Sequence, residues 1–577
     1  MKNLERLLPY VSRHKRTLVF GLLCLIATTA FSVASPWVLR HAIDDLHAAV
    51  TRSKLWTWAG LLLLLVILEG GCRYFMRMVL IGVSRDIEFE LRNDLFAHLA
   101  RLPARFYQDM RIGDVMSRAT SDMSAVRMVL GPGIMYTAST LATFVGTTIF
   151  MFGISPILLG LALVPLLLVS FLVRHYGRQI HDRFEKVQEQ LANLTALVQE
   201  NLSGTRVVRA YVQESQEEAK FAAQSREFVE RNRTLIHLTG ILYPGIQFLM
   251  GTGAVLVLGL GGSLAVQGRI TVGEFVAFGS YLAMLHWPMI ALGWVINLFE
   301  RGEASMGRIG ALLDTVPSIR DEHPRPVVAI AGRVSVRGLT FAYGDTPVLH
   351  DIDLEVAAGS TVAIVGPTGA GKSTLVNLIP RLLDPPPGTV FVDGIDVHEL
   401  PLATLRGAVG FVPQETFLFS ATLRENVAFG LLGDDGGRVE ASAEIAQLAH
   451  DVRGFPKGYE TFVGERGITL SGGQKQRTAL ARAIATDPRI LVLDDSLSAV
   501  DTETEERILD GLRGVMKSRT TFLVSHRVST VKEADLIVVL REGRLVERGT
   551  HEELLARGGF YADLHRRQLL EQEVAVA

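Results

Sequence analysis

The chain has 577 residues, of which 48% are hydrophobic and 20% charged, and its formal net charge is −2. This length allows several domains, and a mean hydropathy of +0.28 is high for a soluble protein. The near-neutral charge supplies no basic field, so no nucleic-acid partner is expected. The two cysteines, Cys24 and Cys72, lie in apolar stretches outside any metal or redox motif and need not pair.

The first half of the chain holds the hydrophobic stretches. Residues 17–39 carry no charge between Arg16 and Arg40, and they are long enough for a transmembrane helix. Further apolar stretches begin near Leu55, Gly131, Pro156, Gly240 and Phe275. The sequence therefore predicts six membrane-spanning helices within residues 17–300, preceded by an amphipathic helix over residues 1–16.

Basic residues predict the orientation of these helices. Two long segments, 84–130 and 174–238, are rich in arginine, whereas the loops on the other side are short and hold few cations. By the positive-inside rule the long segments face the cytoplasm, and six spans return the chain to that side. Neither a lipidation signal nor a cleavable targeting peptide is evident. We therefore expect a multi-pass protein of a bacterial cytoplasmic membrane, with the lipid bilayer as its surroundings.

The character of the chain changes after residue 300. Residues 301–332 are charged and proline-containing, which predicts a short helix followed by a linker. From Arg333 to the end, apolar strands such as 361–366 and 490–495 alternate with helical patterns, which is typical of a soluble α/β domain. Within this domain, 333–577, we expect a helical subdomain between about residues 401 and 485.

The first predicted strand ends in a phosphate-binding motif. The stretch "GPTGAGKST" fits G-x-x-x-x-G-K-[ST], directly after a strand and before a helical pattern. Its backbone N–H groups would surround phosphate oxygens, Lys372 would reach the β- and γ-phosphates, and the Ser373 hydroxyl would bind Mg²⁺. A chance glycine-rich turn is the alternative, but the strand and the Lys-Ser ending disfavour it. The residues expected at the nucleotide are Gly366, Pro367, Thr368, Gly369, Ala370, Gly371, Lys372, Ser373 and Thr374.

A second motif adds a resemblance to a known family. The stretch "LSGGQKQR" is followed by "ILVLDD", and together with the first motif it resembles the ATP-binding cassette (ABC) transporters over essentially the whole chain. The resemblance implies a membrane α-helical bundle of exporter type with six transmembrane helices, followed by an α/β P-loop ABC ATPase domain. It also implies ATP and Mg²⁺ as cofactors. The signature residues are Leu470, Ser471, Gly472, Gly473 and Gln474.

The same resemblance implies roles for residues outside these two motifs. Tyr343 would stack on adenine, and Gln414 would sense Mg²⁺ and the attacking water. Asp494 would be the acid at the metal, together with Ser373 and Gln414, and His526 would be the switch histidine. The matching D-loop residues are Ser498, Ala499 and Asp501.

Asp495 departs from the family's pattern, in which a glutamate follows the metal aspartate as general base. An aspartate withdraws its carboxylate by about 1 Å, and such a misplacement can cost roughly 10²-fold in rate. This pattern resembles heterodimeric exporters, in which the partner chain supplies the glutamate. Catalytic roles are therefore expected for Asp495, His526 and Gln414, with a weakened site in this chain. A homodimer in which Asp495 is a slower base is the alternative.

Two cytoplasmic segments, 102–122 and 200–211, resemble the coupling segments that dock on ATPase domains in this family. Glu465 and Arg466 lie where the family contacts such segments. The alternative is that both segments are solvated extensions of the membrane helices. In the family, ATP lies between the phosphate loop of one domain and the signature of another, so a second half-transporter is expected as partner.

Polar residues within the spans are candidates for a substrate cavity. Glu69 is ionisable, although Arg73 four residues on could neutralise it along the helix. Gln247, His286 and Asn297 could line the same cavity. The composition is compatible with export of a small amphipathic drug, lipid or peptide. The alternative is a nucleotide-gated regulatory or channel subunit that binds ATP but hardly hydrolyses it.

Overall fold

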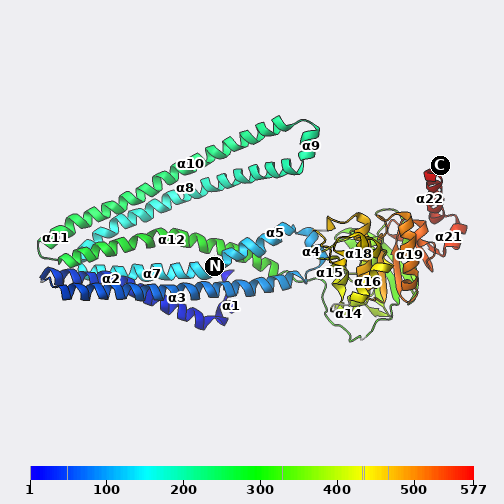
Figure 1. The fold of residues 1–577 in the computed structure, drawn as a ribbon, viewed down its shortest axis with the longest axis horizontal. Coiled ribbons are helices and arrows are strands. Elements are labelled where there is room, and N and C mark those ends of the chain that lie inside the picture. Colours follow the sequence, from blue (N-terminus) through cyan, green and yellow to red (C-terminus); the bar gives the residue numbers. More distant parts are fainter. Residues whose placement is uncertain are drawn as a thin grey trace. The chain divides into compact units, whose positions relative to one another are not determined.

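The chain folds into two compact units, Met1–Ala100 with Met110–Thr315 and Arg101–Asp109 with Val316–Ala577. The computed structural model describes residues 2–48, 50–327, 329–431, 433, 436–464 and 467–576, apart from the side chains at 289, 290, 292, 502 and 571–576. Glu465 and Arg466 lie outside the described residues. Figure 1 shows the fold.

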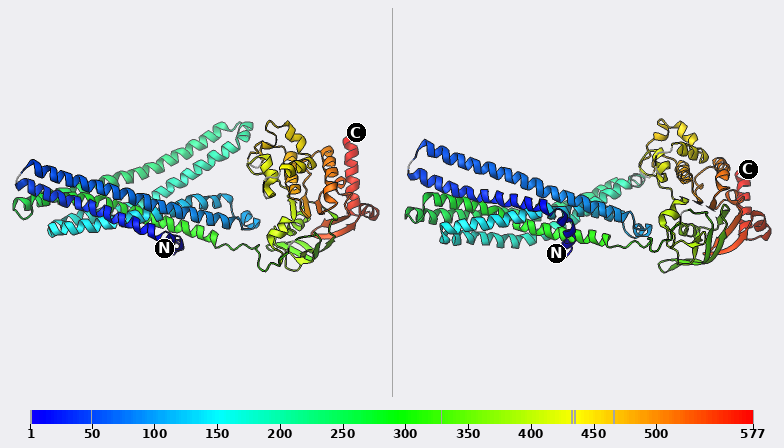
Figure 2. Two further views of the ribbon diagram at one scale, coloured as in Figure 1. Left: turned by 60° about the horizontal axis from the view of Figure 1, so that its bottom comes forward. Right: turned by 90° about the horizontal axis from the view of Figure 1, so that it is seen from below.

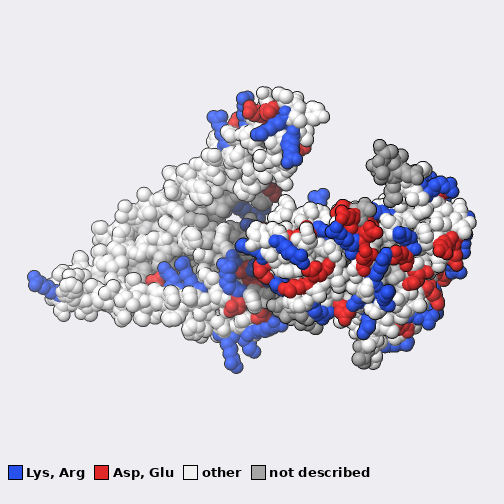
Figure 3. All heavy atoms as spheres, turned by 45° about the vertical axis from the view of Figure 1, so that its right-hand side comes forward, with Lys and Arg blue, Asp and Glu red and all other residues white. Residues whose placement is uncertain are grey.

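The first unit is helical. It begins with a 3₁₀ turn (Leu4–Leu7) and α1 (Leu8–Arg13). In the described part of the chain, six helical segments are long and apolar enough to cross a membrane. They are Lys15–Ala48 (α2), Arg52–Leu99 (α3), Ile112–Ile154, Pro156–Ser203 (α8), Glu214–Val266 and Val272–Leu313 (α12). The six predicted spans are confirmed, and in Figure 3 much of the visible surface of this unit carries no charged side chain.

Two of the six segments contain π-helical turns. The third comprises α5 (Ile112–Ser117), a π-turn, α6 (Met123–Met128), a second π-turn and α7 (Ile134–Ile154). The fifth comprises α10 (Glu214–Leu256), a π-turn and α11 (Gly262–Val266). α2 packs along α3, and α8 packs along α10, to which it is joined by the short α9 (Thr205–Ala210) (Figure 2).

The last membrane helix extends past the expected end of the membrane domain. α12 continues through residue 300 to Leu313, so the short helix expected at the start of 301–332 is the end of α12. Near this end the Asp122 carboxylate accepts from Arg308 Nε at 2.8 Å, and Asn3 N–H donates to Glu303 Oε1 at 3.0 Å. These contacts join the third segment and the N-terminal turn to α12.

The second unit contains two sheets. An antiparallel sheet has the order β2-β1-β4-β5, and a six-stranded sheet has the order β10-β9-β3-β8-β7-β6 within the described residues. The first is formed by β1 (Val334–Tyr343), β2 (Thr346–Val356), β4 (Val390–Val392) and β5 (Ile395–Asp396). The second is formed by β3 (Thr361–Val365), β6 (Val409–Val412), β7 (Ile490–Asp494), β8 (Thr520–Val524), β9 (Leu536–Arg541) and β10 (Arg544–Gly549).

The strands β3, β7 and β8 are buried along their whole length, as expected for parallel strands covered on both faces. Alternate residues of β3 belong to different apolar clusters, Ala363 and Val365 to one and Val362 and Ile364 to the other.

The helices of this unit are α4 (Ala104–Asp109), α13 (Lys372–Leu378), α14 (Leu402–Gly407), α15 (Leu423–Val427), α16 (Gly436–Ile445), α17 (Ala449–Gly454), α18 (Gly472–Ala485), α19 (Thr502–Met516), α20 (Val528–Val531), α21 (His551–Arg557) and α22 (Phe560–Val576).

One expectation about this unit is wrong. The helical subdomain was expected from about residue 401, but β6 lies inside that range and pairs in parallel with β7. The residues of β6, "VGFV", form a short apolar run, and such a run can become a buried strand as readily as part of a helix. The helices of the subdomain therefore begin with α15.

Candidate nucleotide-binding site

The phosphate-binding loop connects β3 to α13, and its backbone demands glycine at two positions. Gly366 has φ +156°, and a Cβ there would lie 2.0 Å from the Leu540 carbonyl oxygen. Gly371 has φ +96° and approaches the Leu349 side chain just before α13 begins. The loop therefore curls closely over the end of the sheet and leads its N–H groups to the start of a helix, where phosphate oxygens bind.

Lys372 is held by the loop that precedes it. Its Nζ donates to the carbonyl oxygens of Gly366 at 2.8 Å and Pro367 at 2.9 Å. Burial lowers the pKa of the Lys372 ammonium, while the charges of Asp495 and Asp494 oppose that shift. The ammonium thus lies in the loop, in position to turn toward bound phosphate oxygens.

Ser373 and Asp494 form the expected pair of oxygen donors. The Ser373 hydroxyl donates to Asp494 Oδ1 at 3.0 Å, and Asp494 is 3% exposed at the end of β7. Burial raises the pKa of the Asp494 carboxyl; the hydrogen bond from Ser373 opposes this shift, and the negative charge of Asp495 adds to it. The half-buried Ser373 hydroxyl and the buried Asp494 carboxylate, side by side, offer the oxygen ligands that Mg²⁺ prefers.

The two donors face a cleft of about 350 Å³. Gln414 lines the same cleft, as do the phosphate-binding loop, Asp495 and His526. Tyr343 lies beside it, with its hydroxyl 3.4 Å from the Thr374 hydroxyl and its ring 40% exposed. The structure therefore brings together the residues expected at the phosphates, with a half-exposed aromatic ring next to them.

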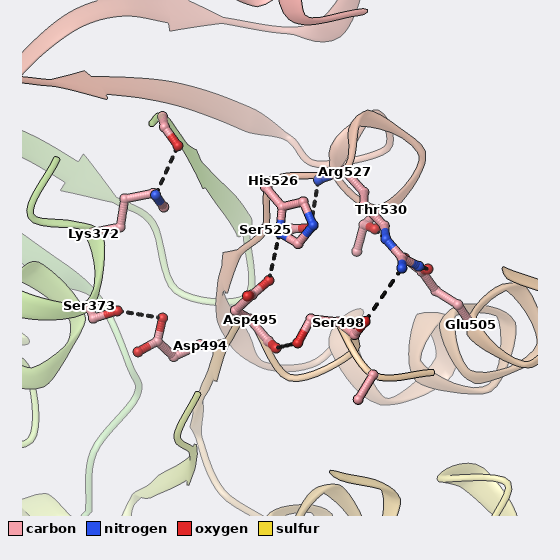
Figure 4. Close-up of polar contacts among 12 residues, drawn as sticks. Lys372, Ser373, Asp494, Asp495, Ser498, Glu505, Ser525, His526, Arg527 and Thr530 are labelled. Carbon is pink, nitrogen blue, oxygen red and sulfur yellow. Dashed lines mark hydrogen bonds and ion pairs between the residues drawn. The ribbon is translucent and has the colours of Figure 1, made fainter. Parts of the chain in front are cut away.

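Asp495 contacts His526 at the wall of the cleft (Figure 4). Asp495 Oδ1 accepts a hydrogen bond from His526 Nδ1 at 3.0 Å, and the His526 side chain is 56% exposed. Asp495 has φ +46°, a left-handed conformation that aspartate adopts more readily than most residues. Its main chain is fixed on both sides, because its N–H donates to the Val524 carbonyl and its carbonyl accepts from Ser498.

The signature residues lie at the start of α18. Ser471 is the N-cap of this helix: its hydroxyl accepts from the Gln474 N–H at 3.3 Å, and the Gln474 side chain accepts from the Ser471 N–H at 3.0 Å. This capping box leaves Gly472 and Gly473 in the first turn, while Leu470 is buried. Among the described residues that line the cleft, none belongs to the signature.

Comparison with known proteins matches both units. Residues 18–289 match the family model "ABC transporter transmembrane region", and residues 349–498 match the model "ABC transporter". The chain is 36% identical over 561 residues to "Probable multidrug resistance ABC transporter ATP-binding/permease protein YheI" of Bacillus subtilis, covering 95% of both chains. The chain belongs to the ABC exporter family.

Other relatives of the exporter agree. It is 34% identical to the ATP-dependent lipid A-core flippase of Syntrophus aciditrophicus, covering 99% of this chain and 95% of that one. A solved structure, "Structure of a bacterial Atm1-family ABC exporter with ATP bound", superposes with a TM-score of 0.80 at 31% identity, covering 96% and 98%. The exporter is thus a nucleotide-binding ABC ATPase, with ATP hydrolysis coupled to transport, in the bacterial inner membrane with its ATPase domain in the cytoplasm.

The residues expected to form the D-loop contact α18 through a residue that the sequence did not single out. Gln476, on α18 and 5% exposed, donates to the Ser498 hydroxyl at 3.1 Å and accepts from the Ala499 N–H at 2.9 Å. Asp501 then caps α19 by accepting from the Thr504 N–H at 2.9 Å. Gln476 lies two residues beyond the signature, within the quoted stretch "LSGGQKQR", and that proximity was the available signal.

The candidate substrate residues do not come together around one cavity. Glu69 is ion-paired with Arg73 on α3, as the neutralised alternative anticipated. Gln247 lies exposed on α10; His286, half-buried, and Asn297, exposed, lie on α12. A largely apolar cavity of about 360 Å³ lies between α7, α8 and α12, and none of these four is among the described residues lining it. Its lining residues are Thr137, Thr140, Leu141, Phe144, Ser170, Pro288 and Val295.

The two expected coupling segments differ in the compact unit to which they belong. The first is divided: α4 groups with the ATPase unit, while 110–122 remains with the membrane unit. The second, 200–211, contains α9, and in it Val207 and Tyr211 are strongly exposed. The proposed contact residues Glu465 and Arg466 lie outside the described residues.

Proposed function

We propose that this exporter is the weakened half of a heterodimer, which binds ATP and Mg²⁺ at its own phosphate loop but hydrolyses that ATP slowly. Asp495 carries the proposal. It stands where the family has a glutamate, and its shorter side chain already contacts His526 at 3.0 Å. A carboxylate set back by about 1 Å from the attacking water would cost roughly 10²-fold in rate.

The nucleotide roles proposed for the other residues follow the donor types in the cleft. Ser373, Asp494 and Gln414 would hold Mg²⁺, and Lys372 would leave its loop carbonyls for the β- and γ-phosphates. Mg²⁺ would neutralise phosphate charge and the charge of the buried Asp494. Tyr343, half-exposed beside the cleft, would stack on the adenine.

A partner is proposed because one chain supplies only part of a complete site. The signature residues are absent from the described lining of the cleft, so Ser471 and the first N–H groups of α18 would act on ATP bound by another subunit. We propose a partner half-transporter with a glutamate base, to whose ATP this chain lends an intact signature. Closure of the two ATPase domains on ATP, and reopening after hydrolysis, would drive alternating access.

The substrate class is proposed as a small amphipathic compound. Relatives are named as multidrug and lipid A-core transporters, and the cavity between α7, α8 and α12 is lined mainly by apolar side chains with a few hydroxyl groups. Such a lining binds apolar bodies and offers few hydrogen bonds for orientation. Glu69, Gln247, His286 and Asn297 stay candidates for polar contacts along the transport path.

The test compares steady-state ATPase activity of the chain purified alone in lipid with that of the chain co-purified with a glutamate-bearing half-transporter. The proposal expects little activity alone and restoration by the partner. The Asp495→Glu variant of the lone chain serves as the matched control for the base. A lone chain that forms a homodimer with robust turnover, which Asp495→Asn abolishes, would contradict the proposal and make Asp495 a working base.

A further inference from the structure

Gln568, in the C-terminal helix α22, contacts the main chain of the switch histidine. Its side-chain Nε2 donates to the His526 carbonyl oxygen at 2.6 Å, and its Oε1 accepts from the Val528 N–H at 2.8 Å. A single amide thus holds the backbone on both sides of Arg527. The Val528 N–H is the first of the short helix α20, and a helix start leaves its N–H groups without intrahelical partners, so the Gln568 side chain supplies one.

The placement of Gln568 is fixed by the other end of α22. The Phe560 N–H donates to Glu547 Oε1 at 2.6 Å, and the fully buried Tyr561 shares a hydrogen bond of 2.7 Å with His551 Nδ1. Gln568 follows Tyr561 by seven residues, or about two helical turns, so both side chains lie on the same face of α22. Anchoring Tyr561 in the core therefore directs Gln568 to residues 525–528, which we call the switch loop.

Other contacts of the switch loop are made by Arg527, the residue next to His526. Arg527 pairs with the buried Glu505 of α19, and its N–H donates to the Ser525 hydroxyl at 3.0 Å (Figure 4). The His526 ring itself is more than half exposed, and its hydrogen bond is to Asp495. Among the described residues, Gln568 is the one whose side chain bonds to the His526 main chain.

We propose that Gln568 is a positioning residue of the ATP site, through which the C-terminal helix sets the distance between His526 and the base position at 495. Because the half-exposed imidazole of His526 is packed by few neighbours, the position of its main chain determines the position of the ring. Releasing the carbonyl of His526 lets the ring drift from the γ-phosphate and from residue 495. A drift of about 1 Å is enough to cost on the order of tenfold or more in rate.

The proposal separates hydrolysis from binding. The groups expected to bind ATP, such as Lys372 and Ser373, are held by the phosphate loop and by Asp494, which Gln568 does not touch. Loss of Gln568 should therefore leave ATP binding unchanged and slow hydrolysis at this chain's own site. A merely structural role would instead lower stability and binding together.

The experiment uses the exporter purified in lipid with whatever half-transporter it carries, and with Asp495→Glu so that its own site can hydrolyse ATP. Azido-ATP radiolabelled at its α-phosphate is photocrosslinked to this chain, either on ice or after turnover, and the attached nucleotide is identified. Gln568→Leu removes both hydrogen bonds, whereas Gln568→Glu keeps the acceptor for Val528 and loses the donor to His526. Arg567→Gln, at the exposed neighbouring position on α22, is the control.

Gln568→Leu should lower the rate at which diphosphate forms on this chain by about tenfold. Labelling on ice should be unchanged, Gln568→Glu should lie between Leu and the parent, and Arg567→Gln should match the parent. Equal diphosphate formation in Gln568→Leu and the parent, with His526→Ala inactive, would overturn the inference and leave the exporter assignment intact. Absence of diphosphate on this chain in the Asp495→Glu parent would also overturn it, because His526 would then support no hydrolysis.

Discussion

The ATPase unit has two regions that we propose contact nucleotide, and they differ in how completely they match the family's sequence pattern. At the start of α18 the signature is whole, with Ser471 in a capping box that holds the first turn. At the end of β7 Asp494, the acid proposed to bind Mg²⁺, is present, but Asp495 follows it where the family's pattern has a glutamate. The region that this chain would lend to a partner is intact, whereas the region it keeps is altered. On our proposal this difference reflects an unequal division of catalysis between two subunits.

The largest expected effect comes from changing the signature at the start of α18, which we propose acts on the partner's ATP. Ser471→Ala should lower the steady-state ATPase activity of the complete transporter by roughly 10²-fold, because on our proposal it removes a hydroxyl that donates to the γ-phosphate of ATP bound by the partner. The lost cap costs about 1 kcal/mol of stability, which the domain should tolerate. Ser471→Thr keeps the hydroxyl and serves as control. A full rate for Ser471→Ala would place the signature outside the active site.

The next effect concerns nucleotide binding at this chain's own site, at the end of β7. Burial raises the pKa of the Asp494 carboxyl. The folded state is therefore stabilised by the protonated carboxyl at low pH and loses this stabilisation as pH rises through the raised pKa. At neutral pH the buried negative charge lowers the free energy of unfolding. Asp494→Asn should therefore raise the thermal midpoint of the ligand-free protein. It should also abolish the stabilisation of the folded protein by bound Mg²⁺-ATP, which is about 2.7 kcal/mol when the free ligand concentration is 100 times its dissociation constant. An unchanged nucleotide-induced shift in the variant would remove Asp494 from the metal site.

A smaller gain is expected from restoring the usual base. Asp495→Glu should speed hydrolysis at this chain's own site about tenfold, because the longer side chain returns the carboxylate toward the attacking water. The gain is less than the full 10²-fold because glutamate fits the left-handed φ of +46° less well than aspartate. Single-turnover ATP hydrolysis measures this rate, with His526→Ala as the inactive reference. A slower variant would show that Asp495 is already placed for catalysis.

The smallest effect should come from neutralising the altered base. Asp495→Asn should reduce the ATPase activity of the complete transporter by less than about twofold, since on our proposal the partner's glutamate does most of the work. The hydrogen bond to His526 can be kept, because the Asn carbonyl accepts from Nδ1 as the carboxylate does. A loss as large as that of Ser471→Ala would erase the difference between the two regions.

The sequence was informative where function depends on short local motifs. Lys372 and Ser373 follow a strand and begin a helix, and Asp494 ends another strand, so their meeting could be inferred from the spacing and the α/β pattern. The membrane helices were equally predictable, because a run of uncharged apolar residues leaves few alternatives. Both expectations depend on neighbours in the sequence.

The remaining features depend on long-range packing. Gln568 meets His526 from a helix 42 residues away, and no motif marks it, because an amide that bonds to main chain can be placed by any helix with the correct register. β6 was missed because four apolar residues fit a strand or a helix equally well. The apolar cavity between α7, α8 and α12 depends on how three helices cross, which the hydrophobicity of each one does not specify.

The most direct test of the unequal division is the identity of the nucleotide held by this chain during turnover. The complete, unmodified transporter is supplied with radiolabelled azido-ATP, photocrosslinked, and separated into its subunits. Our account predicts mainly triphosphate on this chain and diphosphate on its partner. Diphosphate on this chain, formed as fast as on the partner, would contradict it and show that Asp495 supports full hydrolysis.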